Sequence, residues 1–479
     1  MVTTELSPGL LQRIERAQPK TARTFQIRTP IDGSVLAEAA DCGAEQARAA
    51  ADLASDAFES WKRTTAYQRA DLLRRWLALV NENRQNMARL MAMEMGKPVT
   101  ESLGEIRYSA AFIEWYAEEA KRVYGETIPS QFAHKRIIVL KQPAGVVYAI
   151  TPWNFPYAMI ARKVAPALAA GCTVILKPAE QTPLSALYLA ALWEEAGGPP
   201  ATFQVLPALD PVPVSEPLLD DPRVRVLTFT GSTAVGMNLY ERCAKTMKRL
   251  ALELGGHAPF LIFADADIEA AVREVVASKF RNAGQTCVCA NRIYANRKIA
   301  DEFTDGLARA AEKLRVGNPL DPQTQIGPLV NAQGLEKVER HVADAISKGA
   351  RAATGGRARN GLYFEPTVLT QVTSEMLMMR EETFGPVAPV VQFHEEEEAV
   401  RLANDTPYGL AAYLWTRDLS RAFRVGEALE YGIVGVNDGV PSTAQAPFGG
   451  KKNSGIGREG GRLGIDEFLD VKHLSISLM

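Results

Sequence analysis

The sequence predicts an α/β protein built on parallel, doubly wound sheets. From residue 146 to Gly256, short apolar runs rich in branched residues alternate with helical patterns. Such alternation places parallel strands between covering helices. A second alternating block runs from Ile268 to about Tyr431. The 479 residues, 47% of them hydrophobic and 23% charged, suffice for roughly two or three domains with a large buried core.

The chain before the first block is mainly helical. Residues 44–61 have alanine-rich helical spacing, residues 65–95 are predicted as one long amphipathic helix, and residues 101–124 continue the helical character. From His134 the pattern changes, because residues 134–148 alternate and are rich in branched side chains, as strands are.

The two blocks then give strands and helices in order. We expect strands over 146–150, 173–176, 203–206, 226–229, 292–295 and 388–393, and helices over 158–170, 183–196 and 233–245. Residues 470–479 alternate again and are predicted as a lone terminal strand. Since a lone strand needs a partner sheet, we expect it to complete an oligomer interface with the 134–148 ribbon.

Composition narrows the class of protein. A net charge of −2 argues against a nucleic-acid surface. The first residues lack the pattern of a signal peptide, and the most apolar stretch, residues 164–176, is too short and interrupted to span a bilayer. The five histidines lack metal-ligand spacing, and the five cysteines are few and odd in number. We therefore expect a cytoplasmic protein that binds no metal, membrane or nucleic acid.

A thiol and a carboxylate predict covalent chemistry on a carbonyl. Cys287 follows Gly284, and Glu253 precedes a pair of glycines. A thiolate can attack the carbonyl carbon, and a carboxylate can later take a proton from water. Asn154, in Thr-Pro-Trp-Asn-Phe-Pro after a predicted strand, offers an uncharged amide donor for an oxyanion. The alternative is that this asparagine satisfies only local backbone.

Two further segments suit a dinucleotide. Lys177 and Glu180 close a predicted strand, where they can bind ribose hydroxyls. A carboxylate there repels a 2′-phosphate, which favours NAD over NADP while leaving NADP possible; an exposed surface pair is the alternative. Gly231 lets the backbone approach a pyrophosphate, and Ser232 begins a helix whose N-terminus supplies N–H donors. Ser232 can also serve as the N-cap.

Taken together, these motifs resemble the NAD(P)-dependent aldehyde dehydrogenase superfamily over essentially the whole chain, with Trp153-Asn154, Lys177, Gly231, Glu253, Cys287, Glu382 and Phe448 in family order. The resemblance implies the aldehyde dehydrogenase-like fold. It comprises a Rossmann-type dinucleotide-binding domain (1–125 and 147–253), an α/β catalytic domain (254–450) and a small β oligomerisation element (126–146 and 465–479). The terminal strand itself predicts a homo-oligomer, either a homodimer or a homotetramer.

The resemblance assigns roles to individual residues. Cys287 forms a thiohemiacetal and then a thioester as hydride passes to NAD(P), Asn154 shares the oxyanion with the Cys287 N–H, and Glu253 is the general base. Lys163 and Glu459 support the proton path of that base. The cofactor-binding residues that it implies are Trp153, Lys177, Glu180, Gly231, Ser232, Leu254, Glu382 and Phe384.

Two arginines bear on the substrate. Arg162 and Arg281 occupy positions that carry aromatic residues in relatives acting on apolar aldehydes, and guanidinium groups there would clamp an anion. This pattern resembles succinate-semialdehyde dehydrogenases, in which a serine, here Ser442, completes the carboxylate site. The alternatives are that the arginines pair with structural carboxylates, or that the aldehyde is glutarate semialdehyde, sulfolactaldehyde or one of a broad range.

Cys289 gives a separate hypothesis. In some succinate-semialdehyde dehydrogenases, a cysteine so placed forms a redox-switching disulfide with the nucleophile; the alternative is a small buried filler. Other classes also use a cysteine such as Cys287. A thiol hydrolase would usually use a histidine base, and no histidine lies near a motif. A catalytically silent homologue would typically have lost Cys287 or Glu253.

Overall fold

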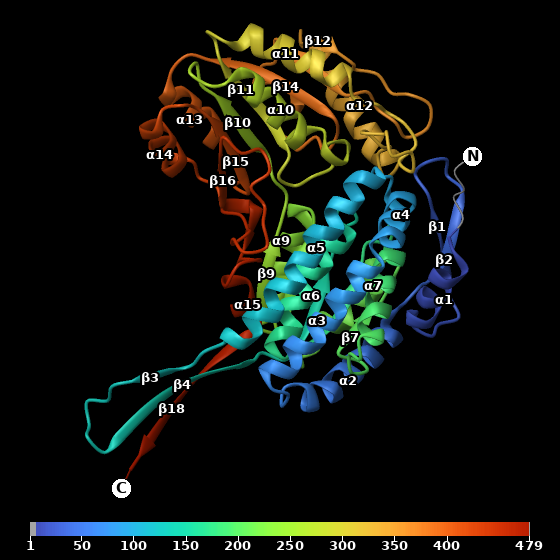
Figure 1. Ribbon diagram of the computed structural model, residues 1–479, viewed down its shortest axis with the longest axis vertical. Coiled ribbons are helices and arrows are strands. Elements are labelled where there is room, and N and C mark those ends of the chain that lie inside the picture. The colour runs from blue at the N-terminus through green and yellow to red at the C-terminus, as the bar shows by residue number, and fades with distance from the viewer. Residues whose placement is uncertain (1–5, 479) are drawn as a thin grey trace.

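A computed structural model describes residues 6–478 and shows two lobes and a projecting arm (Figure 1). Met1–Glu5 and Met479 lie outside the described residues, so the extreme ends of the predicted 1–125 and 465–479 segments are not placed. Among the described residues, no helix is long and apolar enough to cross a membrane.

The first lobe is built on a six-stranded sheet in the order β17-β9-β8-β5-β6-β7. Its neighbours are parallel except for β17 against β9. The order reverses at β5, and the carboxyl edge of a parallel sheet at such a point is a general ligand-binding position. The strands are β5 (Val146–Ile150), β6 (Thr173–Lys177), β7 (Phe203–Val205), β8 (Val224–Thr230), β9 (Arg249–Glu253) and β17 (Gly455–Ile456).

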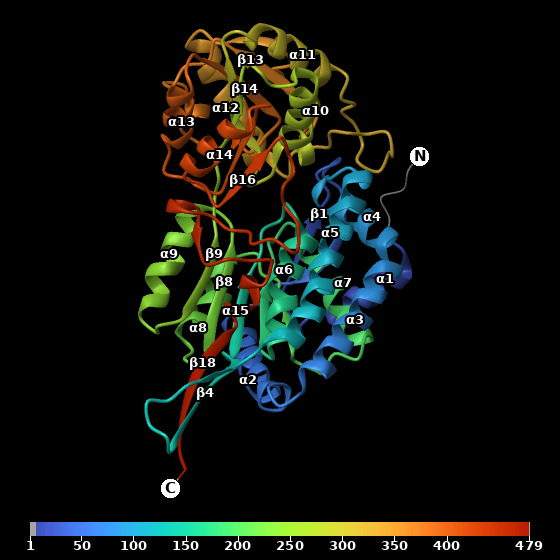
Figure 2. The same cartoon turned by 60° about the vertical axis from the view of Figure 1, so that its left-hand side comes forward.

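Helices cover both faces of this sheet. Every residue of α6 is buried, because the helix lies between the sheet and α5 (Figures 1 and 2). The helices of the lobe are α1 (Pro8–Ala17), α2 (Ala44–Trp61), α3 (Ala66–Glu82), α4 (Arg84–Met95), α5 (Val99–Glu119), α6 (Pro156–Ala170), α7 (Pro183–Glu195), α8 (Pro211–Asp220) and α9 (Thr233–Ala244). A hairpin of β1 (Thr24–Arg28) and β2 (Val35–Ala40), the 3₁₀ turn η1 (Ala120–Arg122) and the short α15 (Leu463–Asp466) complete it.

The second lobe has a seven-stranded sheet in the order β12-β13-β14-β11-β10-β15-β16, parallel except for β12 against β13. Its strands are β10 (Ala258–Ile262), β11 (Ala290–Asn296), β12 (Arg351–Thr354), β13 (Thr367–Thr370), β14 (Val387–Phe393), β15 (Ala411–Trp415) and β16 (Ile433–Val436). Its helices are α10 (Ile268–Lys279), α11 (Ala300–Glu312), α12 (Ala332–Ser347), α13 (Glu396–Asn404) and α14 (Leu419–Ala428), with 3₁₀ turns at η2 (Arg281–Gly284) and η3 (Leu377–Met379). A last turn, η4 (Lys452–Ser454), leads back to the first lobe.

The arm is an antiparallel sheet of β3 (Glu126–Ile128), β4 (Lys135–Pro143) and β18 (Leu469–Ser477) that extends from the body in both views (Figures 1 and 2). The C-terminal strand is therefore paired within its own chain, since β18 runs along the full length of β4. Most of β18 is exposed, including Val471 at 68% and Ile476 at 38%.

One predicted helix and one predicted strand segment differ from the structure. The helix predicted over 65–95 is broken at Asn83, whose φ of −94° and ψ of 6° leave the helical region and whose side-chain amide donates to Leu79 O at 2.8 Å. The 134–148 ribbon is divided between the arm and the first lobe. Gly145 permits the change of direction, because its φ of +138° is accessible mainly to glycine.

Candidate active site

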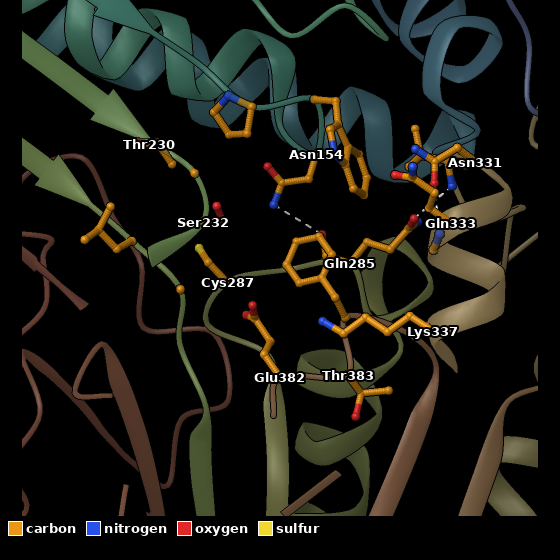
Figure 3. A pocket seen from close by; sticks show the side chains of 18 of the residues that line it. Asn154, Thr230, Ser232, Gln285, Cys287, Asn331, Gln333, Lys337, Glu382 and Thr383 are labelled. Atoms are coloured by element: carbon orange, nitrogen blue, oxygen red, sulfur yellow. Dashed lines mark hydrogen bonds between the residues drawn. The ribbon is translucent and has the colours of Figure 1, made fainter. Parts of the chain in front are cut away.

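Two cavities meet at Cys287. The first has a volume of about 440 Å³ and the second about 320 Å³, and Cys287 lines both. Figure 3 shows the first, with Cys287, Asn154 and Glu382 directed into it. Of the predicted residues, the first cavity is lined by Trp153, Asn154, Gly231, Ser232, Glu253, Leu254, Cys287, Glu382 and Phe384. The second is lined by Arg162, Arg281, Cys287 and Ser442.

The backbone before the nucleophile is held in an unusual conformation. Asn282 and Ala283 have φ of 52° and 53°, and Gly284 has 75°, so three successive residues are left-handed. A Cβ at Gly284 would lie 2.1 Å from the Gly385 carbonyl oxygen. Only glycine therefore fits against the segment that leads into β14. Non-glycine residues adopt this conformation at a cost that surrounding structure must offset, and such strain is typical of functional loops.

Burial dominates the electrostatics of Cys287. Removal from water raises the pKa of the thiol well above its ordinary value, and the negative charge of Glu253 raises it further, while Arg162 opposes the rise. Burial likewise raises the pKa of Glu253, against the opposing charge of Arg162. The Oε1 atom of Glu253 is buried without a hydrogen-bond partner. A carboxyl group with a raised pKa and a free oxygen is suited to accept a proton from water.

Asn154 lies between β5 and α6, opposite the nucleophile. Its Nδ2 donates to Gln285 O at 3.3 Å, the contact drawn as a dashed line in Figure 3. The second N–H of this amide is directed to no described acceptor, so it is available to an oxyanion near Cys287. Its carbonyl oxygen Oδ1 is buried without a partner. Thus the structure brings Asn154, Glu253 and Cys287 to one place.

A buried charge network holds the Asn154 backbone, and sequence reasoning missed it. Lys97 Nζ donates to Asn154 O at 2.7 Å and forms an ion pair with Glu105, and both side chains are buried. Glu105 in turn accepts from Tyr157 N at 2.9 Å, at the start of α6. Asn282 Nδ2 also donates to Asn154 O, at 3.1 Å. The network therefore fixes the loop that carries the amide.

Glu101 extends this network to the nucleophile loop. Its carboxylate accepts from Asn282 N at 2.7 Å, and burial raises its pKa to about 7. Lys97, Glu101 and Glu105 all line the second cavity. The four-residue spacing of Glu101 and Glu105 places them on one face of α5, which was the available sequence signal, whereas Lys97 precedes the helix. Nothing in the sequence pointed to Gln333 and Lys337 of α12, which line the first cavity.

The first cavity fits a dinucleotide at several points. Glu382 Oε1 and Thr230 Oγ1 are buried polar atoms without hydrogen-bond partners, and both residues line the cavity. Burial raises the pKa of Glu382 to about 7, against the charge of Lys337. A Cβ at Gly231 would lie 2.5 Å from the Phe229 ring. A side chain would therefore clash at this position, and with glycine no side chain covers the backbone. Ser232 caps α9 by accepting from Val235 N at 3.4 Å.

Lys177 and Glu180 do not line this cavity. They lie at the carboxyl end of β6, where Lys177 Nζ and Glu180 Oε2 are 3.4 Å apart. Lys177 is buried, whereas Glu180 is about a third exposed. They sit at the same sheet edge as Asn154 and Gly231, because β5, β6 and β8 are parallel neighbours.

The two arginines differ in their surroundings. Among residues 6–478, the Arg281 guanidinium has neither an ion pair nor a hydrogen bond; it lies 5.3 Å from the centre of the Phe155 ring, and its Nε is buried without a partner. Arg162 is fully buried, pairs with Glu459 and lies 3.5 Å from Glu253. The hypothesis of structural pairing therefore describes Arg162, while Arg281 is left free toward the second cavity.

Lys163 and Glu459 lie behind Arg162. Lys163 forms an ion pair with Glu459 and donates to Thr228 Oγ1 at 3.2 Å. Burial favours the neutral acid, but the charges of Arg162 and Lys163 hold the pKa of Glu459 below its ordinary value. Arg162 thus contacts both the Glu459 and the Glu253 carboxylates.

Cys289 is buried beside Lys279 and lines neither cavity. Within the described residues, no three His, Cys, Asp or Glu side chains gather as a metal site.

Comparison with known proteins gives a consistent family. Residues 17–474 match the model of the aldehyde dehydrogenase family. The chain is 53% identical to the succinate-semialdehyde dehydrogenase [NADP(+)] GabD of Escherichia coli, over 95% of this chain and 94% of that protein. It is 51% identical to a glutarate-semialdehyde dehydrogenase of Pseudomonas aeruginosa and to a 3-sulfolactaldehyde dehydrogenase of Pseudomonas putida, in each case over 95% of this chain and 94% of the relative.

Solved structures agree. The crystal structure of an aldehyde dehydrogenase from Brucella melitensis biovar abortus superposes with a TM-score of 0.97, covers 100% of both chains and is 48% identical in sequence.

Proposed function

Because the chain belongs to the aldehyde dehydrogenase family, and is thus an NAD(P)-dependent aldehyde dehydrogenase, we propose that its substrate carries a carboxylate at the far end from the aldehyde. Succinate semialdehyde is the substrate that we propose. The observation that carries the proposal is Arg281, a guanidinium without a partner among the described residues, beside a cavity that ends at Cys287.

The second cavity supports an anionic substrate of limited length. Arg281 and Ser442 supply a charge and a hydroxyl, and Phe155 and Phe448 supply apolar walls. The Arg162 guanidinium lies 4.1 Å from the centre of the Phe448 ring and is already paired with Glu459, so we assign it to shaping the wall and to the charge near Glu253. Arg281 is left as the clamp for the substrate carboxylate.

The mechanism follows from the residues around Cys287. The thiolate adds to the aldehyde carbon, and the Asn154 amide and the Cys287 N–H stabilise the oxyanion. A nicotinamide cofactor held by the residues of the first cavity would supply the hydride acceptor. Cys287 is then a thioester, and Glu253 takes a proton from the water that releases the carboxylic acid. Arg162 lies 3.5 Å from Glu253 and pairs with Glu459. Its positive charge favours the ionised form of Glu253.

For the cofactor, we propose that Glu382 would hold a ribose hydroxyl, that Phe384 and Trp153 would pack beside the nicotinamide end, and that Gly231 and Ser232 would contact the phosphates. Leu254 would line the same cavity. Lys177 and Glu180 would hold the second ribose. The partly exposed Glu180 carboxylate supports a preference for NAD, since it would repel a 2′-phosphate. The relative from Escherichia coli is named as NADP-dependent, so a direct comparison of the two cofactors tests this assignment.

For the assembly, we propose that the first lobe (1–125 and 147–253) is the dinucleotide-binding domain, that residues 254–450 form the catalytic domain, and that the arm (126–146 and 465–479) joins subunits of a homodimer or homotetramer. The exposed apolar residues of β18 support the last point. The five free thiols support a reducing, cytoplasmic setting.

Initial rates of NADH or NADPH formation test the proposal. Succinate semialdehyde, glutarate semialdehyde, sulfolactaldehyde and an uncharged aldehyde of similar length would each be measured with both cofactors. We expect kcat/KM to be highest for succinate semialdehyde with NAD. A highest value for the uncharged aldehyde would contradict the clamp, whereas a highest value for another anion would keep the clamp and change the substrate. Absence of any reduced cofactor would favour a thiol hydrolase.

A further inference from the structure

Lys279 and Cys289 form a buried pair beside the nucleophile that aldehyde oxidation does not use. Lys279 is the last residue of α10, and its Nζ lies 3.2 Å from Cys289 Sγ. The two residues are 0% and 1% exposed. Within the described chain the Lys279 side chain has no carboxylate ion pair, and its other hydrogen bond goes to Asn291 Oδ1 at 3.1 Å. A fully buried lysine amine is normally paired with an anion, whereas the Lys279 amine faces a thiol.

The Asn291 amide gives a second, independent feature of this cluster. Asn291 is 1% exposed, and its Nδ2 is buried without a hydrogen-bond partner, although its Oδ1 binds Lys279. An unmade hydrogen bond of a buried donor is costly. A thiol is only a weak acceptor, whereas an oxygen bound to sulfur is a strong one. The cluster therefore offers a donor that an oxidised cysteine could use and the reduced cysteine does not.

We propose that Cys289 and Lys279 are an oxidation site that closes into a covalent cross-link between Cys289 Sγ and Lys279 Nζ. Hydrogen peroxide is the oxidant. The Cys289 thiolate attacks one peroxide oxygen, so that an S–O bond forms, the O–O bond breaks, and hydroxide leaves and takes up a proton as water. The product is a sulfenic acid at Cys289, and the Asn291 Nδ2–H donates to its oxygen.

The neighbouring amine then completes the cross-link. The unprotonated Lys279 amine attacks the sulfur, an S–N bond forms, and the S–O bond breaks as the oxygen leaves in a second water with a proton from the amine. One peroxide is reduced to two waters, and the thiol and amine together lose two hydrogens. The separation of 3.2 Å means that the two atoms are already in contact before oxidation.

The cross-link would act on the turn that carries the nucleophile. Cys289 N donates to Thr286 O at 3.1 Å, which closes a turn around Cys287. Tyr413 Oη donates to Val288 O at 2.6 Å and fixes the same turn from β15. A covalent bond at Cys289 would therefore tie this turn to the end of α10, and it would remove Cys289 from any disulfide with Cys287. The site is independent of which aldehyde is the substrate.

Peptide mapping by mass spectrometry of the full-length enzyme, with and without hydrogen peroxide, tests the proposal. Trypsin cleaves after Arg273, Lys279, Arg281 and Arg292. Without oxidation, Lys279 is a cleavage site. We expect oxidation to join peptide 274–281, uncut at Lys279, to peptide 282–292 with a loss of two hydrogens, and dithiothreitol to reverse it. The same cross-link with one added oxygen means that a second peroxide was consumed to form an S–O–N bridge, and also supports the site.

Two variants and an internal control make the result specific. Cys287→Ser should still form the cross-link, because the nucleophile takes no part. Lys279→Arg should abolish it, because a guanidinium is not a nucleophile under these conditions. Cys172, which is buried near Phe468 O rather than a lysine, should stay unmodified. A disulfide confined to peptide 282–292, or oxidised Cys289 with normal cleavage at Lys279, would overturn the proposal. The wild-type and Cys287→Ser results decide it even if Lys279→Arg fails to fold.

Discussion

At the scale of single residues, Arg281 and Arg162 show how the same side chain serves two purposes. Arg162 pairs with Glu459 and contacts Glu253, so carboxylates of the protein balance its charge. Arg281 has no described partner and stacks near Phe155 at the wall of the second cavity. The choice of substrate is therefore expected to depend on one guanidinium, and the protonation of the base on the other.

Removing the free guanidinium should change specificity. We expect Arg281→Gln to lower kcat/KM for succinate semialdehyde by about 10- to 100-fold, the value of a hydrogen bond to a charged group, and to leave an uncharged aldehyde of similar length nearly unchanged. Steady-state rates with both aldehydes measure the effect. Arg297→Gln, at an exposed arginine that lines neither cavity, is the matched control. Equal losses for both aldehydes would assign Arg281 a structural role.

The pH dependence of Cys287 reactivity should reflect its surroundings. Burial and the charge of Glu253 both raise the pKa of the thiol, so less thiolate is present at neutral pH and the rate of alkylation by iodoacetamide should climb with pH beyond the range of an ordinary cysteine. Glu253→Gln removes the negative charge, so its profile should shift to lower pH. Identical profiles for the two proteins would show that Glu253 exerts no field on the thiol.

The residues of the active site differ in how far the sequence could predict them. Asn154, Glu253 and Cys287 each stand in a distinctive local pattern, and the structure places them together. Lys97 and Glu105 could not be assigned, because their meaning depends on a loop that folds over them from a distant part of the chain. Local patterns identify groups that react, whereas the groups that hold them are defined only by tertiary contacts.

At the scale of elements, α5 and Lys97, two residues before it, support the loop between β5 and α6. Lys97 binds the Asn154 carbonyl, and Glu105 binds the first N–H groups of α6, where a carboxylate also complements the helix dipole. The two charges pair with each other in a buried setting. Such a pair contributes little net stability if replaced as a whole, but loss of one partner leaves an isolated buried charge.

The network should therefore respond asymmetrically to mutation. We expect Lys97→Met to destabilise the protein by about 3–5 kcal/mol and to lower kcat, because Glu105 loses its partner and Asn154 loses its anchor. Adding Glu105→Leu should recover much of the stability and none of the kcat. Denaturant unfolding and steady-state rates measure the two effects, and Lys62→Met, at a surface ion pair, is the control. Recovery of kcat in the double variant would refute the positioning role.

Elements were predicted well where a strand, a turn and a helix follow one another in regular order. The strand over 146–150 has the predicted bounds, and the helices α6, α7 and α9 differ by a few residues at their ends. The single helix over 65–95 was wrong, because it breaks at Asn83, and helical periodicity does not reveal the hydrogen bonds of that side chain to Leu79, Arg13 and Tyr188. β10 was not assigned a range, since a short, fully buried run of apolar residues gives no alternation.

At the scale of the whole molecule, the two lobes divide the reaction between them. The first lobe supplies Asn154 and Glu253 from the ends of its strands, and the second supplies Cys287 and Glu382 from its loops. Cys287 lines both cavities, so we expect the aldehyde and the cofactor to reach the thiol through separate cavities. No described residue of the arm lines either cavity, and the arm exposes apolar side chains, which is consistent with the proposed contact between subunits.

The arm should determine the oligomeric state. We expect light scattering to give a dimeric or tetrameric mass for the wild type, and the double substitution Val471→Asp with Ile476→Asp to reduce it, since both side chains are exposed in the single chain. Asp71→Asn, a polar exchange at an exposed position on α3, should leave the mass unchanged. A monomeric wild type would contradict the proposed role of the arm.

The central claim is that Cys287 forms a thioester with a carboxylated aldehyde and that Glu253 activates the water that releases it. Intact-mass analysis of the Glu253→Gln variant, mixed with succinate semialdehyde and NAD, tests this most directly. We predict one succinyl group per chain, located on peptide 282–292, together with one equivalent of NADH and almost no further turnover. NADH formed without an adduct on Cys287, or sustained turnover without Glu253, would contradict the account.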